Sequence, residues 1–75
     1  MAPHLPQISG RDAVKAFSKI GYRAVRQRGS HIRLVHADPK RTPLTIPDHT
    51  EIAVGLLRRL LRDADLSFDE FQKLL

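Results

Sequence analysis

The sequence lacks cysteine and tryptophan altogether, and it has only one tyrosine and three phenylalanines in 75 residues. Without cysteine there is no disulfide bond, no thiolate zinc site and no cysteine nucleophile, so stability has to come from packing. No stretch approaches the roughly 20 apolar residues that a membrane-spanning helix needs. We therefore expect no membrane contact and a location in the cytoplasm.

The amino-terminal segment also lacks an apolar run. Met1 to Gln7 contains two prolines, and we expect it to be neither a signal peptide nor an amphipathic anchor. A chain of 75 residues can bury one hydrophobic core but not two. The whole chain, residues 1–75, is therefore predicted to form a single domain.

Acidic residues are fewer than basic ones in this sequence. Eight Asp and Glu residues stand against thirteen Lys and Arg residues, which gives a formal net charge of +5. This balance favours a polyanionic partner over an acidic small molecule. Charge alone does not distinguish among RNA, DNA and anionic lipid, so the choice depends on where the basic residues lie.

The basic residues gather around a predicted tight hairpin, Arg26-Gln27-Arg28-Gly29-Ser30-His31-Ile32-Arg33-Leu34. With Gly29 and Ser30 as a two-residue loop, four pairs follow: Arg28 with His31, Gln27 with Ile32, Arg26 with Arg33, and Val25 with Leu34. Paired residues share a face of the sheet. We predict that the core face carries Val25, Ile32 and Leu34, and that the solvent face carries Arg26, Arg28, His31 and Arg33.

Two simpler interpretations compete with a functional one. Basic residues on the outer face of a half-buried sheet are often only its solvated surface. However, Arg26 and Arg33 would lie directly opposite each other, and opposed like charges destabilise a sheet unless an anion binds there. A lone histidine is more often incidental than catalytic, but three neighbouring arginines favour a role for His31.

Helix signals lie on both sides of the hairpin. Ser9 and Asp12 are spaced as an N-cap and a first-turn acid, and Gly21 supplies the stop. Residues 52–64 have apolar side chains at helical spacing but no clear N-cap. Residues 66–71 combine a capping box with a hydrophobic staple, which predicts a short third helix. The arginines of the second helix, Arg58, Arg59 and Arg62, are interpreted as a solvated face in preference to a binding surface.

Three strands are predicted, at residues 22–28, 31–36 and 42–46. Short connections favour the antiparallel order 1-2-3, and Pro43 argues that the third strand lies at an edge. With a helix before the strands and two after them, the helices cover one sheet face. The fold class is therefore α+β, a two-layer sandwich with one open sheet face that carries His31.

The same elements resemble a known family. The resemblance is carried by Ser9 to Phe17 with Gly21-Tyr22, Arg26 to His31, Thr45-Ile46-Pro47-Asp48-His49, Glu51 to Gly55, and Leu57 to Ala64. The sequence resembles HicA-type toxins, the mRNA interferases of bacterial toxin-antitoxin pairs. It departs from that family at Asp65, where glycine is frequent and a left-handed backbone is expected, and at Leu56, where threonine is common.

The resemblance implies a fold like a double-stranded RNA-binding domain, cleavage of mRNA that arrests translation, and neutralisation by a HicB-type antitoxin. In that family the histidine after Gly-Ser is catalytic, and here this residue is His31. We expect a monomeric free toxin. The residues expected to bind RNA are Arg26, Arg28, Ser30 and Arg33.

RNA carries its own nucleophile, the 2'-hydroxyl, so a histidine among arginines can promote its cleavage without a metal. Imidazole exchanges protons near neutral pH, which suits His31 as a general base. The aspartates lie on different predicted elements and no pair has metal-ligand spacing, so we expect neither metal nor cofactor. His36 should face away from His31, and His49 is either the general acid or only a residue at the entry of the second helix.

A second function from another class remains open. A non-catalytic RNA-binding module would use the same basic sheet face for phosphates and 2'-hydroxyls. A DNA-binding domain fits less well, because no pair of predicted helices has the pattern of a helix-turn-helix.

Overall fold

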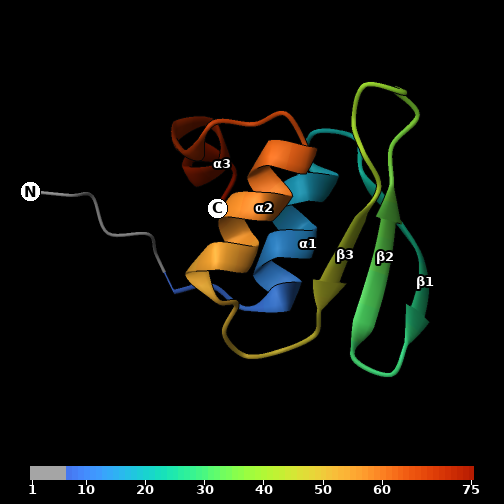
Figure 1. Ribbon diagram of the computed structural model, residues 1–75, viewed down its shortest axis with the longest axis vertical. Helices are drawn as coiled ribbons and strands as arrows, with labels where there is room; N and C mark the ends of the chain where they lie inside the picture. Colours follow the sequence, from blue (N-terminus) through green and yellow to red (C-terminus); the bar gives the residue numbers. More distant parts are fainter. Residues whose placement is uncertain (1–6) are drawn as a thin grey trace, which may run out of the picture.

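The computed structural model describes residues 7–75. Along the chain the elements are α1 (Gly10–Ser18), β1 (Arg23–Arg28), β2 (His31–Val35), β3 (Leu44–Pro47), α2 (Val54–Asp63) and α3 (Phe68–Leu74). The strands form one antiparallel sheet in the order β1-β2-β3. Figure 1 shows the three helices on one side of the sheet, and no described residue covers its other side. The predicted α+β fold with one open sheet face is confirmed.

The helix ends follow local signals in the sequence. The Ser9 hydroxyl accepts from the Asp12 N–H at 3.0 Å, and Ser67 and Glu70 form the same kind of capping box at the start of α3. Ala53 precedes α2 without a side-chain cap, as the missing N-cap signal predicted. Asp65 has a φ of 56°, the left-handed conformation expected of it. No helix in the described part of the chain has the length and apolar character of a membrane span.

The core lies between the helices and the covered face of the sheet. Phe17 of α1 packs against Phe71 of α3 with ring centroids 5.1 Å apart, and against Tyr22 edge-on at 5.8 Å. The sheet contributes four buried side chains: Ile32, Leu34, Leu44 and Ile46. The buried hydroxyl of Tyr22 donates to the carbonyl of Thr42 at 2.8 Å, and burial raises its pKa. Packing of this kind is what a protein without disulfides relies on.

The register of the hairpin agrees with the prediction near the turn and departs from it further away. The three pairs that start with Arg28 and His31 form as predicted. The predicted pairing of Val25 with Leu34 is wrong, because a β-bulge lies between Ala24 and Arg26 and Ala24 pairs with Leu34. Val25 is the extra residue of the bulge and is 49% exposed instead of facing the core.

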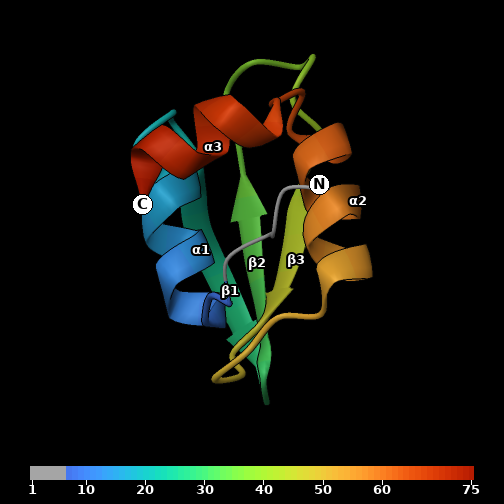
Figure 2. The same cartoon turned by 90° about the vertical axis from the view of Figure 1, so that its left-hand side faces the viewer.

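The low burial of β1 explains why this strand can accept a bulge. The sheet is covered by α1 beside β1 and by α2 beside β3, with α3 across one end (Figure 2). All six residues of β1 are nevertheless exposed, whereas β2 and β3 bury alternate side chains. An edge strand that buries little gains little by keeping Val25 on the core side, so its register is weakly constrained there.

Candidate functional site

The site begins at a two-residue turn. Gly29 has a φ of +54° whereas Ser30 does not have a positive φ, and this pattern is that of a type II′ turn with glycine in first place. A type II′ turn matches the twist of the strands it connects. It therefore fixes Arg28 opposite His31 at the end of the sheet.

The open face of the sheet carries the four predicted basic side chains near the turn, and Arg23, the partner of Val35, lies further along β1 on the same face. His31 lies exposed between Arg28 of β1 and Pro47 of β3, its partners in the sheet. Arg26 lies opposite Arg33 one step further from the turn, so two like charges face each other as predicted. The one ion pair among residues 7–75 joins Arg11 to Asp48 and includes none of these arginines. The arginines of the open face therefore have no carboxylate partner there.

Arg33 differs from Arg26 and Arg28. It is half-buried, and its Nη1 donates to the Thr45 hydroxyl of β3 at 3.1 Å. Arg26 and Arg28 are exposed on the edge strand β1. One guanidinium is thus fixed across the sheet, and two can reach toward a ligand.

The residue before His31 is held by the far strand. The carbonyl of Ser30 accepts from the backbone N–H of Asp48, just past the end of β3. The Asp48 carboxylate accepts from Arg11 of α1, at 3.1 Å from Nε and 3.3 Å from Nη2. Gln27 donates from one nitrogen to the Gly29 carbonyl at 3.0 Å and to Asp48 at 3.4 Å. We call Arg11, Gln27 and Asp48 the turn clamp, because together they connect the hairpin turn to α1.

The turn clamp also favours the charged form of Asp48. The hydrogen bonds from Arg11 hold the pKa of the Asp48 carboxyl below its ordinary value. The hydrogen bonds thus favour the charged carboxylate that accepts them. Sequence reasoning did not assign a role to Asp48. Its position directly after Pro47 could have indicated a contact with the turn. That inference requires the register between β2 and β3, which the sequence does not provide.

Of the two other candidate histidines, His36 faces the helix side, as its position in the strand predicted. Its Nε2 lies 2.6 Å from the Ile20 carbonyl, and its Nδ1 accepts from the Asp38 N–H at 2.9 Å. Since Nδ1 accepts, Nε2 carries the proton and donates. With both ring nitrogens engaged away from the open face, His36 is a structural residue.

His49 lies exposed in the loop between β3 and α2. Its carbonyl accepts from the Gly10 N–H at 2.8 Å, which attaches this loop to the first turn of α1. The helix begins at Val54, five residues later, so His49 is not the entry residue of α2. Its ring stays available to solvent near the end of the sheet that carries the turn.

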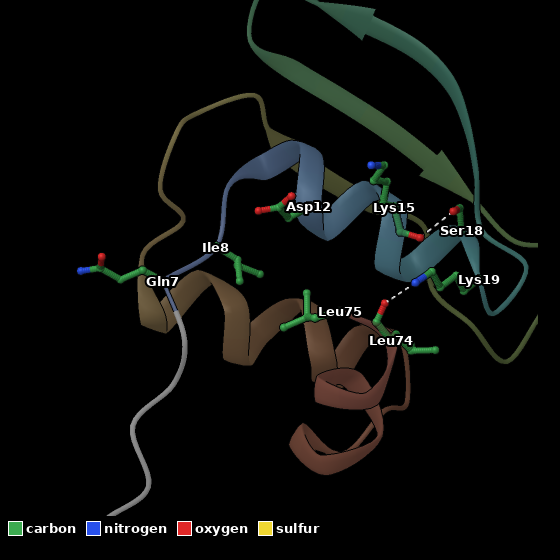
Figure 3. A pocket seen from close by; sticks show the side chains of 8 residues that line it. All are labelled: Gln7, Ile8, Asp12, Lys15, Ser18, Lys19, Leu74 and Leu75. Carbon is green, nitrogen blue, oxygen red and sulfur yellow. Dashed lines mark hydrogen bonds between the residues drawn. The ribbon is translucent and has the colours of Figure 1, made fainter.

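Metal-ligand side chains do not gather at this face. Within residues 7–75 no three His, Cys, Asp or Glu side chains come close enough to hold one ion. A hollow of about 680 Å³ lies instead in the helix layer, between α1 and the end of α3, where Lys19 donates to the Leu74 carbonyl at 2.7 Å (Figure 3). No residue of the open sheet face lines that hollow, so it lies apart from the candidate site.

The comparison with protein families decides what kind of protein carries this face. A family model described as the HicA toxin of bacterial toxin-antitoxin systems matches residues 10–66, which is well over half of the chain. The chain belongs to the HicA toxin family. The match covers the hairpin, the turn clamp and α2 and ends before α3. No curated protein matches the sequence.

Membership of the HicA family has two direct consequences. It confirms the resemblance predicted from the sequence, and it gives the protein the toxin's part in a toxin-antitoxin pair. It also means that the protein has an antitoxin as its partner. For a HicA toxin, a basic sheet face without acidic partners is the surface to examine for both the target and the antitoxin.

Proposed function

We propose that this HicA toxin is an endoribonuclease that cleaves mRNA in the cytoplasm without a metal ion and so arrests translation. The observation that carries the proposal is the exposed imidazole of His31 on a face that also bears Arg26, Arg28 and Arg33. Imidazole transfers protons near neutral pH, and one guanidinium group can donate two parallel hydrogen bonds to the oxygens of a phosphate. The face therefore has both kinds of group that cleavage of RNA needs.

In the proposed reaction, neutral His31 takes the proton of a ribose 2'-hydroxyl. The 2'-oxygen then forms a bond to the adjacent phosphorus, and the bond from phosphorus to the 5'-oxygen breaks. The 5'-oxygen leaves with a proton from His31 in its imidazolium form or from His49. The products are a 2',3'-cyclic phosphate and a 5'-hydroxyl, so atoms and charges balance without a co-reactant.

Arginines stabilise the charge that develops during this step. The non-bridging oxygens of the attacked phosphate carry additional negative charge in the transition state, and fixed cations close to them lower the barrier. Arg33 is held by Thr45, which makes it the most preorganised of the three. Arg26 lies opposite Arg33, and a phosphate bound between them would relieve the repulsion in the sheet. Ser30, exposed at the turn, adds a hydroxyl beside His31.

The same face suits inhibition by the antitoxin. We propose a HicB-type antitoxin that covers His31 and supplies acidic or aromatic groups to the unpaired arginines. Complementary charge of this kind accelerates association and selects the partner. One surface then serves RNA and antitoxin in turn, so that they compete.

A simple incubation tests the catalytic proposal. Purified full-length protein is mixed with single-stranded RNA in EDTA, and the products are resolved by length and end group. We expect cleavage that leaves cyclic phosphate ends and continues in EDTA. Activity that EDTA abolishes and magnesium restores would contradict metal-independent catalysis. Tight RNA binding without cleavage in any condition would instead favour the non-catalytic RNA-binding module.

A further inference from the structure

A hollow of about 470 Å³ lies where the free edge of β3 meets α2. Figure 2 shows α2 running beside β3. Arg33 and Thr45 line the hollow from the sheet, whereas Leu56 and Arg59 line it from α2. The hollow therefore joins the open face of the sheet to the arginine-bearing side of α2.

The walls of the hollow are fixed relative to each other. The backbone N–H of Thr42, just before β3, donates to the carbonyl of Asp63 at the end of α2 at 3.1 Å. From the sheet side, the Thr45 hydroxyl holds the Arg33 guanidinium at 3.1 Å. A site whose walls and one cation are already in place loses less entropy when it binds a ligand.

Positive charge dominates this hollow. Arg33 and Arg59 both line it, and Asp63 is the one carboxylate among the lining residues. Asp63 forms no ion pair with either arginine in the described part of the chain. Two guanidinium groups against one carboxylate leave the hollow with a net positive charge, which favours an anionic ligand.

The remaining lining suits a nucleotide more than a bare anion. Thr42 and Thr45 offer hydroxyl groups, and Pro43, Leu56 and Leu60 provide an apolar wall. A backbone phosphate can bind the arginines while its sugar or base lies against the apolar wall. The volume also lies within the range of about 300 to 1,000 Å³ that is usual for small-ligand sites.

The hollow is connected to the proposed site of cleavage. Arg33 follows His31 by two residues in β2 on the same face of the sheet, so their Cα atoms lie about 7 Å apart along the strand. An RNA chain with its scissile phosphate at His31 that runs across β2 toward β3 then passes Arg33 and enters the hollow. This continuity, together with two arginines for phosphates and two threonine hydroxyls for sugars, makes RNA the occupant for which we argue, and a segment of the antitoxin is the alternative that the test below distinguishes.

We propose that the hollow is an RNA subsite that binds a backbone phosphate adjacent to the scissile one, with Arg59 as its ligand and with Arg33, which lies between the two positions, contacting both phosphates. The proposal rests on the endoribonuclease function proposed above. It assigns Arg59 a role in substrate binding, whereas the sequence favoured a solvated helix face for all three arginines of α2. Arg58 does not line the hollow and keeps that interpretation.

Arg58 provides a matched control, because it is exposed on the same helix and carries the same charge. Binding of a short labelled single-stranded RNA is measured at several salt concentrations in the full chain carrying His31→Ala, which prevents cleavage. Arg59→Gln is expected to weaken binding about tenfold at low salt and to reduce the slope of log affinity against log salt by about 0.7. Arg58→Gln should change the affinity by less than about twofold.

A second variant tests the same site, and here RNA binding is expected to become tighter instead of weaker. Asp63→Asn removes the negative charge from the hollow without changing the size of the side chain, so RNA should bind more tightly. A loss of helix stability alone would not increase the affinity. In cleavage assays with His31 intact, Arg59→Gln should raise KM and leave kcat nearly unchanged, as expected for binding away from the reacting atoms.

Equal effects of Arg58→Gln and Arg59→Gln on RNA binding would overturn the subsite. So would an Arg59→Gln protein that binds RNA as its parent does but loses affinity for the antitoxin, because the hollow would then belong to the protein interface. The proposed function fails by a different measurement, namely the absence of cleavage by the protein with His31 intact. The two failures are therefore distinguishable.

Discussion

The backbone N–H of Asp48 donates to the carbonyl of Ser30, and Ser30 directly precedes His31. The Asp48 carboxylate is in turn bound by Arg11 of α1 and by Gln27 of β1. One residue thus attaches the hairpin turn to the helix layer through its backbone and its side chain. Because substitution leaves the backbone contact in place, the contribution of the carboxylate can be tested separately.

Asp48→Ala is expected to slow cleavage without unfolding the protein. The ion pair with the exposed Arg11 contributes little to stability, so the circular dichroism spectrum should be unchanged. A looser turn lets His31 move relative to the phosphate, and since a displacement of 1 Å can cost about 10²-fold, we expect kcat to fall roughly tenfold. KM should change less, because the arginines of the open face remain. Steady-state kinetics on a single RNA check this.

Arg11→Gln breaks the same link from the other side and serves as the control. If Arg11 acts through Asp48, the two single variants and the double variant should lose similar activity, because a shared interaction is non-additive. Full additivity of the two effects, or parent activity in Asp48→Ala, would show that the turn clamp does not position His31.

The turn clamp also predicts how stability depends on pH. Hydrogen bonds from Arg11 hold the pKa of Asp48 below its ordinary value of 3.8. A carboxyl group with a lowered pKa binds fewer protons in the folded state, so its contribution is complete above about pH 4 and is lost as the pH falls through the folded-state pKa. Because Arg11 is exposed, we expect this loss to be small when denaturant unfolding is compared at neutral and acid pH. In Asp48→Asn the loss of stability at acid pH should be smaller but not absent. Hydrogen bonds from Ser67 also lower the pKa of Glu70, so protonation of Glu70 still destabilises the fold.

The parts of this fold that the sequence predicted correctly rest on local chemistry. Ser9 and Ser67 cap their helices through residues three positions away, and Gly29 pairs Arg28 with His31 across two loop residues. These interactions need no knowledge of distant segments. The bulge at Val25 cannot be predicted without such knowledge. It depends on how little of β1 the helices cover, and the residues near Val25 do not determine how the helices pack.

The candidate site divides in the same way. The face shared by His31, Arg26 and Arg33 follows from the hairpin alone and was predicted. The turn clamp was not, because Asp48 meets Ser30 only through the register between β2 and β3, which are joined by residues 36–43. The role inferred for Arg59 has the same origin, since Arg33 and Arg59 come together only after α2 packs beside β3.

Gly21→Ala is expected to destabilise the fold. Gly21 has a φ of +104°, and a Cβ there would lie 2.6 Å from Nε2 of His36. His36 cannot move aside without losing its contacts with Ile20 and Asp38. We expect a loss of about 1 to 3 kcal/mol in the free energy of unfolding, measured with denaturant.

Gly55→Ala is the control, and it is expected to stabilise the protein instead of destabilising it. Gly55 lies in the first turn of α2, has no positive φ, and nothing lies within 4 Å of an added Cβ. Alanine should therefore stabilise the helix by up to about 1 kcal/mol. If Gly21→Ala were as stable as Gly55→Ala, the close packing of Gly21 against His36 would be wrong.

Arg26→Gln should separate stability from binding. Arg26 lies opposite Arg33, so removing its charge relieves a repulsion and should raise the free energy of unfolding by roughly 0.2 to 1 kcal/mol. RNA binding should weaken at the same time, because a phosphate contact is lost. Thermal unfolding and RNA titration of the same sample check both effects. A less stable Arg26→Gln protein with unchanged RNA affinity would argue against an anion-binding role for this pair.

The substitution His31→Ala separates the enzyme from the RNA-binding module. His31 is exposed at the start of β2, so its loss leaves no cavity, and a surface change of this kind alters stability by less than about 0.5 kcal/mol. The arginines stay in place, so the variant should bind RNA and antitoxin as before. Cleavage should fall by about 10² to 10⁴, the usual contribution of a general base. Expression of the variant should therefore be harmless to cells although the protein is folded.

Three measurements on one preparation make this prediction decisive. Thermal unfolding reports the fold, RNA titration reports the arginine face, and end-group analysis of the products reports the chemistry. A folded His31→Ala protein that cleaves as fast as its parent would end the catalytic assignment of His31. In that case His49, the other histidine exposed near the turn, would be the next candidate for the base, and His49→Ala would be the variant to measure.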